Sequence, residues 1–189
     1  MSPHKYPFIP DIGLVVHETF GISFDAFQWG WFFAIPISSQ AYHVIAIEPA
    51  PANYEMLCRN VKRNSCENVT PIHSAMSSID GEVELNLGVS GTTGHSVTSK
   101  KRSGPHTTVP SCSLMTAVTR WGPTVLKLGC EGAEWVILTD PGLLQGIRII
   151  VAELHKVTGT KLHALEQAGY QYTIKSNGWF SKLIAHKEI

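Results

Sequence analysis

From residue 43 onward the chain alternates short β-branched runs with segments whose apolar residues recur at helical spacing. Residues 43–47 predict a strand. Residues 51–64 predict a helix, because the apolar residues between Tyr54 and Val61 fall on one face. Strands separated by helices are typical of a parallel sheet whose right-handed crossovers place helices on both faces. The alternation therefore predicts an α/β fold.

The same pattern continues to the end of the chain. We expect further strands at residues 69–75, 81–87, 124–128 and 146–154, and further helices capped by Ser111, at 131–139 and at 160–168. Two final strands, 170–175 and 180–186, flank the turn sequence Ser176-Asn177-Gly178, which favours an antiparallel hairpin. The sheet is thus predicted to be mostly parallel, with a C-terminal antiparallel hairpin.

Length and composition fit one domain over residues 1–189, with 43% hydrophobic residues. Residues 1–24 form either an N-terminal extension or lid, or the segment that supplies the first strand. Residues 88–110 are rich in Gly, Ser, Thr and Pro, and this predicts a long loop suited to contacting a substrate.

The charge balance and the cysteine pattern exclude several classes of partner. The 15 Lys and Arg residues equal the 15 Asp and Glu residues, so no basic surface for nucleic acid is expected. The most apolar stretch, residues 27–37, is broken by Pro36 and is too short to span a membrane. Four cysteines without paired spacing indicate free thiols in a reducing, cytoplasmic compartment, and no histidine spacing indicates a metal.

An aromatic run within that apolar stretch has two interpretations. If it forms a helix, Trp29, Phe32 and Phe33 make a core stripe, which is the commoner case. If they are exposed instead, the same side chains would mark a surface for a homodimer or a surface adjacent to a membrane.

In open α/β sheets, ligands bind beyond the carboxyl ends of the strands. Glu48 directly follows an apolar strand and precedes Pro49. It is placed either to accept hydrogen bonds from the two hydroxyls of a ribose or to stabilise the N-terminus of the next helix. Spacing alone does not decide between these roles.

Six blocks of sequence resemble the FkbM family of methyltransferases. Two short ones are Leu57 to Val61 and Ala168 to Tyr170, and the others are Val44 to Pro51, Asn68 to Ser77, Leu126 to Glu134, and Val151 to His155. The resemblance covers about residues 43–186. It implies a Rossmann-like methyltransferase sheet, S-adenosylmethionine as cofactor, and methyl transfer to a hydroxyl of a small-molecule acceptor such as a glycan or a polyketide-like compound. The cofactor-binding positions implied by it are Asp25, Gly30, Glu48, Pro49, Ala75, Met76 and Gly129.

The candidates for a general base lie in the last two blocks. Glu131 and Glu134 are three residues apart at an expected helix start, where they are either catalytic or simply N-terminal helix acids. Glu153 and His155 share one face of a strand end. His155 titrates near neutrality and is the better base, with Glu153 orienting it in the alternative, structural interpretation.

Two positions depart from the family pattern. Asp25 lies 48 − 25 = 23 residues before Glu48, close to the family spacing for the first motif, but Phe27 stands where a glycine is expected. Gly129 stands where the family usually has Asp. A catalytically inactive relative that acts as a binding or interaction protein is therefore the alternative hypothesis. A nicotinamide oxidoreductase is the least favoured hypothesis, because the chain lacks the G-x-G-x-x-G turn of those enzymes.

Overall fold

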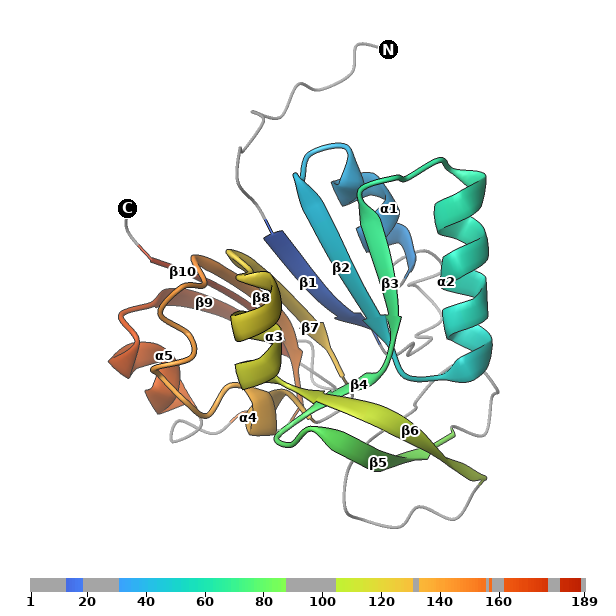
Figure 1. The fold of residues 1–189 in the computed structure, drawn as a ribbon. Coiled ribbons are helices and arrows are strands. Elements are labelled where there is room, and N and C mark those ends of the chain that lie inside the picture. The colour runs from blue at the N-terminus through green and yellow to red at the C-terminus, as the bar shows by residue number, and fades with distance from the viewer. Residues whose placement is uncertain are drawn as a thin grey trace.

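The computed structural model describes residues 13–18, 31–87, 105–130, 133–155, 157, 162–176 and 181–187, with the side chains of 13–18 and 31–33 excluded. These residues form a seven-stranded sheet (Figure 1). Its strands, in spatial order, are β3 (Val69–His73), β2 (His43–Glu48), β1 (Gly13–Glu18), β7 (Val125–Gly129), β8 (Ile149–Leu154), β10 (Ser181–His186) and β9 (Gln171–Ser176). The first five are parallel, and β10 runs antiparallel to both of its neighbours.

Helices cover both faces of the sheet. They are α1 (Trp31–Ser38), α2 (Pro51–Arg63), α3 (Leu114–Trp121), α4 (Glu134–Ile137) and α5 (His163–Gln167). The side chains of β2 point alternately to the two faces of the sheet and so into two separate cores. Val44 and Ala46 pack in one core with residues of α1 and α2, whereas Ile45 and Ile47 pack in the other core with residues of α3 and α4.

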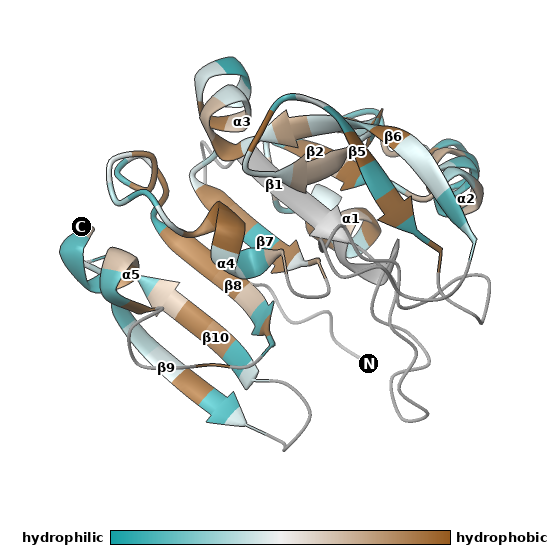
Figure 2. Ribbon diagram, turned by 90° about the horizontal axis from the view of Figure 1, so that it is seen from below, coloured by the Kyte–Doolittle hydropathy of each residue, from teal (hydrophilic) through white to brown (hydrophobic). Residues whose placement is uncertain are grey.

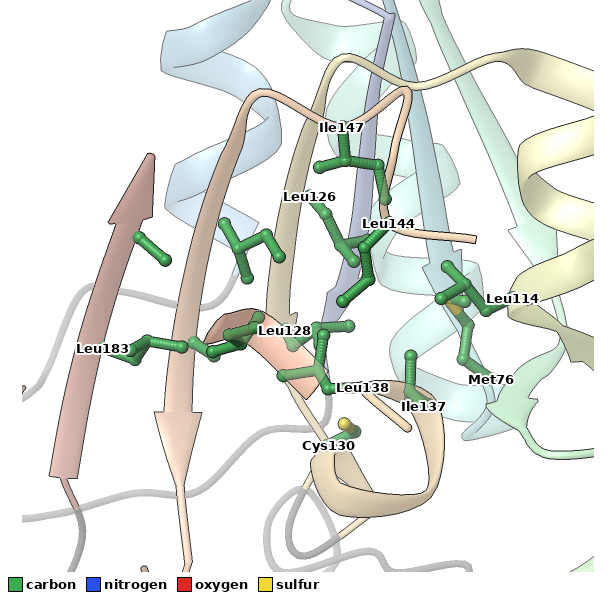
Figure 3. Close-up of a cluster of buried hydrophobic side chains, with 14 of the residues drawn as sticks. Met76, Leu114, Leu126, Leu128, Cys130, Ile137, Leu138, Leu144, Ile147 and Leu183 are labelled. Carbon is green, nitrogen blue, oxygen red and sulfur yellow. The ribbon is translucent and has the colours of Figure 1, made fainter. Parts of the chain in front are cut away.

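The larger core lies between the sheet and the layer of α3, α4 and α5. It contains apolar side chains from all three helices and from β7, β8 and β10 (Figures 2 and 3). In β8 every second residue belongs to it, so Ile150, Ala152 and Leu154 are buried while the residues between them are half-buried. This alternation fixes which face of β8 looks toward α4.

A second, three-stranded sheet is inserted between β3 and α3. Its order is β4 (Ala75–Ser77), β6 (His106–Ser113) and β5 (Gly81–Asn86). It has a small core of its own that includes Ala50 from the loop after β2. The second sheet therefore packs against the carboxyl end of β2, where the arrowheads of β2 and β3 point in Figure 1.

Local sequence explains where the helices begin and end. Pro51 occupies the first turn of α2, where its missing N–H costs nothing. The Ser113 hydroxyl accepts a hydrogen bond from the Thr116 N–H (3.2 Å) and caps α3. Gly122 ends α3 in the left-handed conformation, at φ 55°. Within the described ranges no helix is long and apolar enough to cross a bilayer.

Most of the predicted elements are confirmed, including the strand at 43–47, the helix at 51–64 and the terminal antiparallel hairpin. Others are shorter than predicted. Strand β8 begins at Ile149 rather than at residue 146, and α4 spans only Glu134–Ile137. The cap of α3 is Ser113, not Ser111, because β6 continues through residues 111–113.

Two predictions about the middle of the chain are wrong. The strand expected at 69–75 breaks at Ser74, whose hydroxyl donates a hydrogen bond to the Pro110 carbonyl oxygen (3.1 Å) of the second sheet. The loop expected at 88–110 includes strand residues, since 106–110 pair with β5. Residues 88–104 lie outside the described part.

Of the two interpretations of residues 1–24, the structure shows the one in which they supply the first strand. Gly13–Glu18 forms β1, between β2 and β7 in the main sheet. The first strand thus ends at Glu18, well before Asp25. Asp25, Gly30 and the side chains of the aromatic run up to Phe33 lie outside the described residues.

Candidate active site at the carboxyl ends of the parallel strands

The order of the strands places a switch point between β1 and β7. The chain proceeds from β1 to β2 and β3 on one side and returns to β7 and β8 on the other. Consecutive crossovers therefore cover opposite faces, and the carboxyl ends of β1 and β7 form the edge at which such sheets bind ligands. Glu18 and Gly129 are register partners at that edge.

Glu48 lies at the same edge, at the end of β2. Its side chain is only 2% exposed. Its Oε1 atom accepts a hydrogen bond from the backbone N–H of Ala50 (2.8 Å), the N-cap residue of α2. One carboxylate oxygen therefore organises the turn from β2 into α2, so the structural role considered for Glu48 is present.

His73 holds the backbone next to Glu48 in place. It ends β3 and is the register partner of Glu48. Its Nε2 atom lies 3.1 Å from the carbonyl oxygen of Pro49, and its ring stacks on Tyr54 with centroids 4.8 Å apart. A hydrogen bond with the Cys58 side chain, together with burial, raises the pKa of the Tyr54 hydroxyl. Tyr54 is therefore neutral at physiological pH, and the stack joins α2 to β3.

Ala75 and Met76 lie in β4, and both are fully buried. The Met76 side chain packs in the larger core beside Leu114 and Ile137 (Figure 3). The Ala75 methyl belongs to the core of the second sheet. Any contact of these two residues with a ligand would therefore be made by their backbone.

The ends of β7 and β8 bring together a second group of residues. Glu134, the first residue of α4, is fully buried, and its Oε1 atom accepts a hydrogen bond from the Cys130 N–H (3.2 Å). The same Oε1 atom lies 3.5 Å from Nδ1 of His155, which directly follows β8. The Trp135 indole N–H donates to the His155 carbonyl oxygen. Two of the predicted base candidates thus lie in contact.

Glu153 has a different setting. It is half-buried in β8, and its register partner across the antiparallel pair is Lys182 of β10. Opposite charges at directly paired positions stabilise such a pair of strands. Glu131 lies outside the described residues.

Two residues at this edge were not among the sequence predictions. Glu18 follows the run Leu14-Val15-Val16 much as Glu48 follows Ile45-Ala46-Ile47. That similarity between the two strand ends points to Glu18, whereas the distance of 23 residues to Glu48 favours Asp25. No local sequence pattern points to His73, because its role depends on Tyr54 and Pro49, which are distant from it in sequence. In the described part of the chain, no group of three or more His, Cys, Asp or Glu side chains is placed to hold a metal ion.

No protein-family model matches the chain, and no curated protein matches it in sequence. Solved structures do match it in fold. A precorrin-6y C5,15-methyltransferase from Geobacter metallireducens is 14% identical, with a TM-score of 0.51 over 94% of this chain and 81% of that one. TYW2 of M. jannaschii, solved in complex with AdoMet, is 18% identical, with a TM-score of 0.49 over 96% and 72% of the two chains.

A third structure, a putative tRNA (m1A22) methyltransferase from Streptococcus pneumoniae, is 13% identical with a TM-score of 0.49, over 94% of this chain and 64% of that one. The likeness to the precorrin enzyme, together with the strand order, establishes the fold. It is an α/β fold of the Rossmann-like methyltransferase type, as the sequence predicted.

Proposed function

We propose that the protein is an S-adenosylmethionine-dependent methyltransferase that modifies a hydroxyl of a small molecule, such as a sugar or a polyketide-like compound. The observation that carries the proposal is Glu48, a buried carboxylate at the carboxyl end of β2 in a sheet of the methyltransferase type. The hydroxyl acceptor follows from the FkbM resemblance and is the finer part of the proposal, as is membership of that family.

The residues at the edge of the sheet fit the cofactor. The Glu48 carboxylate would accept hydrogen bonds from the ribose hydroxyls, since an acidic residue after a strand does this in nucleotide-binding α/β folds. Pro49 and His73 hold its turn, and the backbone of Ala75 and Met76 follows the adjacent strand. Glu18, at the end of β1, adds a further acidic residue to this edge.

Gly129 faces Glu18 across the switch point and has no side chain. It therefore leaves room at the centre of the edge for the reacting groups of donor and acceptor.

When bound, S-adenosylmethionine supplies a methyl group activated by a sulfonium. The chain then has to align the acceptor and take up the proton that its hydroxyl loses. Alignment alone can contribute effective molarities on the order of 10⁵ M. His155 is the proposed proton acceptor, and a positioned base adds about 10²–10⁴-fold. Glu134 is placed beside it.

A second candidate function is favoured by Gly129. A carboxylate at that position would lie close to the transferred group, and here none is present at the end of β7. A protein that binds the cofactor or its product without transferring a methyl group, and serves as a binding or interaction module, fits this feature. The four cysteines are all free thiols, which accords with the cytoplasmic location proposed for either function.

Transfer of a radiolabelled methyl group from S-adenosylmethionine to a panel of sugars and polyketide-like alcohols tests the proposal. We expect transfer by the wild-type protein and its loss in His155→Ala, with unchanged affinity for the cofactor. His163→Ala, which removes an exposed histidine on α5, is the matched control and should remain active. Full turnover by His155→Ala would remove His155 from the mechanism. Cofactor binding without transfer to any acceptor would favour the inactive relative.

A further inference from the structure

We propose that Glu134, and not Glu153, is the positioning residue of His155: it holds the imidazole with its proton on Nδ1 and leaves Nε2 as the nitrogen that accepts a proton. A catalytic role for the His155–Glu134 pair rests on the proposed function. The tautomer of His155 itself can be tested on the protein without cofactor or acceptor.

The first step is the distance between the two groups. Glu134 Oε1 lies 3.5 Å from His155 Nδ1. The same oxygen accepts the Cys130 N–H at 3.2 Å, so the carboxylate is held by the loop that leaves β7. A shift of about 0.5 Å brings the Nδ1–H into normal hydrogen-bonding range. A carboxylate next to one ring nitrogen selects the tautomer that carries the proton there.

The second step is the burial of the ring. Glu134 is completely buried, and His155 Nδ1 is buried as well. The His155 side chain as a whole is nevertheless 29% exposed, so solvent reaches other atoms of it. The nitrogen on the Glu134 side is therefore enclosed, and when it carries the proton the basic lone pair of the neutral ring is on Nε2.

The third step is the backbone. Trp135 follows Glu134 in α4, and its indole N–H donates to the carbonyl oxygen of His155. Trp135 also packs against the larger core. Two consecutive residues of one short helix therefore contact His155, Glu134 at its ring and Trp135 at its main chain.

Glu153, the other carboxylate near the end of β8, lies on the opposite face of the sheet from α4. In β8 the core face carries Ile150, Ala152 and Leu154, and this is the face against which α4 packs. Glu153 lies between the last two and so belongs to the opposite face of the sheet, level with Lys182 of β10. His155 lies past the end of β8, where the alternation of the strand no longer sets its side, and the carboxylate 3.5 Å from its Nδ1 is that of Glu134.

The ring nitrogens of ¹⁵N-histidine-labelled protein report the tautomer directly by NMR, with His155→Gln identifying the resonances of His155. At a pH where the ring is neutral, we expect the wild-type protein to carry the proton on Nδ1. In Glu134→Leu the population should move by a large fraction toward the Nε2–H form. Glu134→Gln should restore the wild-type tautomer, because the amide oxygen can accept the same hydrogen bond. Glu153→Leu is the matched control and should change nothing.

Three outcomes would overturn the inference: an Nε2–H tautomer in the wild-type protein, an unchanged tautomer in Glu134→Leu, or a change in Glu153→Leu equal to that in Glu134→Leu. If Glu134→Leu fails to fold, Glu134→Ala makes the same test, and an unchanged tautomer in that variant would also overturn it. No cofactor or acceptor enters the measurement. Its failure is therefore distinguishable from a failure of the proposed methyl transfer, which the labelled-methyl assay detects.

Discussion

At the scale of single residues, the candidate site consists of carboxylates that differ in what surrounds them. Glu48, at the end of β2, and Glu134, the first residue of α4, are both buried, and each accepts a hydrogen bond from a nearby backbone N–H. Glu48 could be predicted from sequence because it directly follows a strand. The contact of Glu134 with His155 could not, because it depends on α4 folding back onto the end of β8.

Tyr170 is the residue on which we expect stability to depend most visibly away from the site. Its buried hydroxyl donates to the carbonyl oxygens of Leu144 (3.0 Å) and Ile147, and burial raises its pKa far above the usual value. Tyr170→Phe should lower the free energy of unfolding by about 1–3 kcal/mol, because the Ile147 carbonyl loses a buried donor. Urea denaturation followed by circular dichroism measures the loss.

Tyr172→Phe is the matched control for that measurement. Its hydroxyl donates to the exposed carboxylate of Glu166 (2.8 Å), so its removal should change the unfolding free energy by no more than about 0.5 kcal/mol. Equal losses in the two variants would show that the buried hydrogen bonds of Tyr170 do not stabilise the turn at 141–147.

At the scale of elements, the sequence predicts types better than boundaries. The strand expected at 69–75 is split because Ser74 turns the chain from the main sheet into the second one. Ser74 carries no local signal for this, since its partner Pro110 is 36 residues away. Similarly, 106–110 have the composition of a loop and become a strand only by pairing with β5. Long-range pairing overrides local composition in both places.

The start of α3 predicts a dependence of stability on pH. The Asp80 carboxylate accepts hydrogen bonds from the Ser113 N–H (2.8 Å), the Thr116 hydroxyl (2.8 Å) and the Ser113 hydroxyl (3.0 Å). These bonds, that from the Ser113 N–H most of all, lower the pKa of Asp80 in the folded state. Since that pKa lies below the unfolded value of about 3.9, the stabilisation is present above pH 4 and is lost as the pH falls through the folded pKa.

Asp80→Asn should therefore lower the melting temperature more at pH 7 than near pH 2, because the wild-type carboxyl loses its charge as the pH falls through the folded pKa. Thermal unfolding followed by circular dichroism at the two pH values tests this. Glu55→Gln removes an exposed charge from α2 and accounts for the effect of net charge alone. A loss of the same size in Asp80→Asn at both pH values would mean that the charge of Asp80 does not contribute.

At the scale of the whole molecule, the alternation of strands and helices was enough to predict a mostly parallel sheet with an antiparallel hairpin. The order of its strands was not predictable, because order is set by crossovers that leave no local trace. That order nevertheless determines the site. By placing β1 between β2 and β7, it brings Glu18 to the carboxyl edge of the sheet and puts Gly129 opposite it.

The central claim is that the carboxyl edge of this sheet binds S-adenosylmethionine through Glu48. Calorimetric titration of the purified protein with S-adenosylmethionine and, separately, with S-adenosylhomocysteine tests it most directly. We predict binding of both compounds in the micromolar range, weakened about tenfold or more in folded Glu48→Ala and unchanged in Glu55→Ala. Absence of binding of either compound to well-folded protein, or equal binding by Glu48→Ala, would contradict the account.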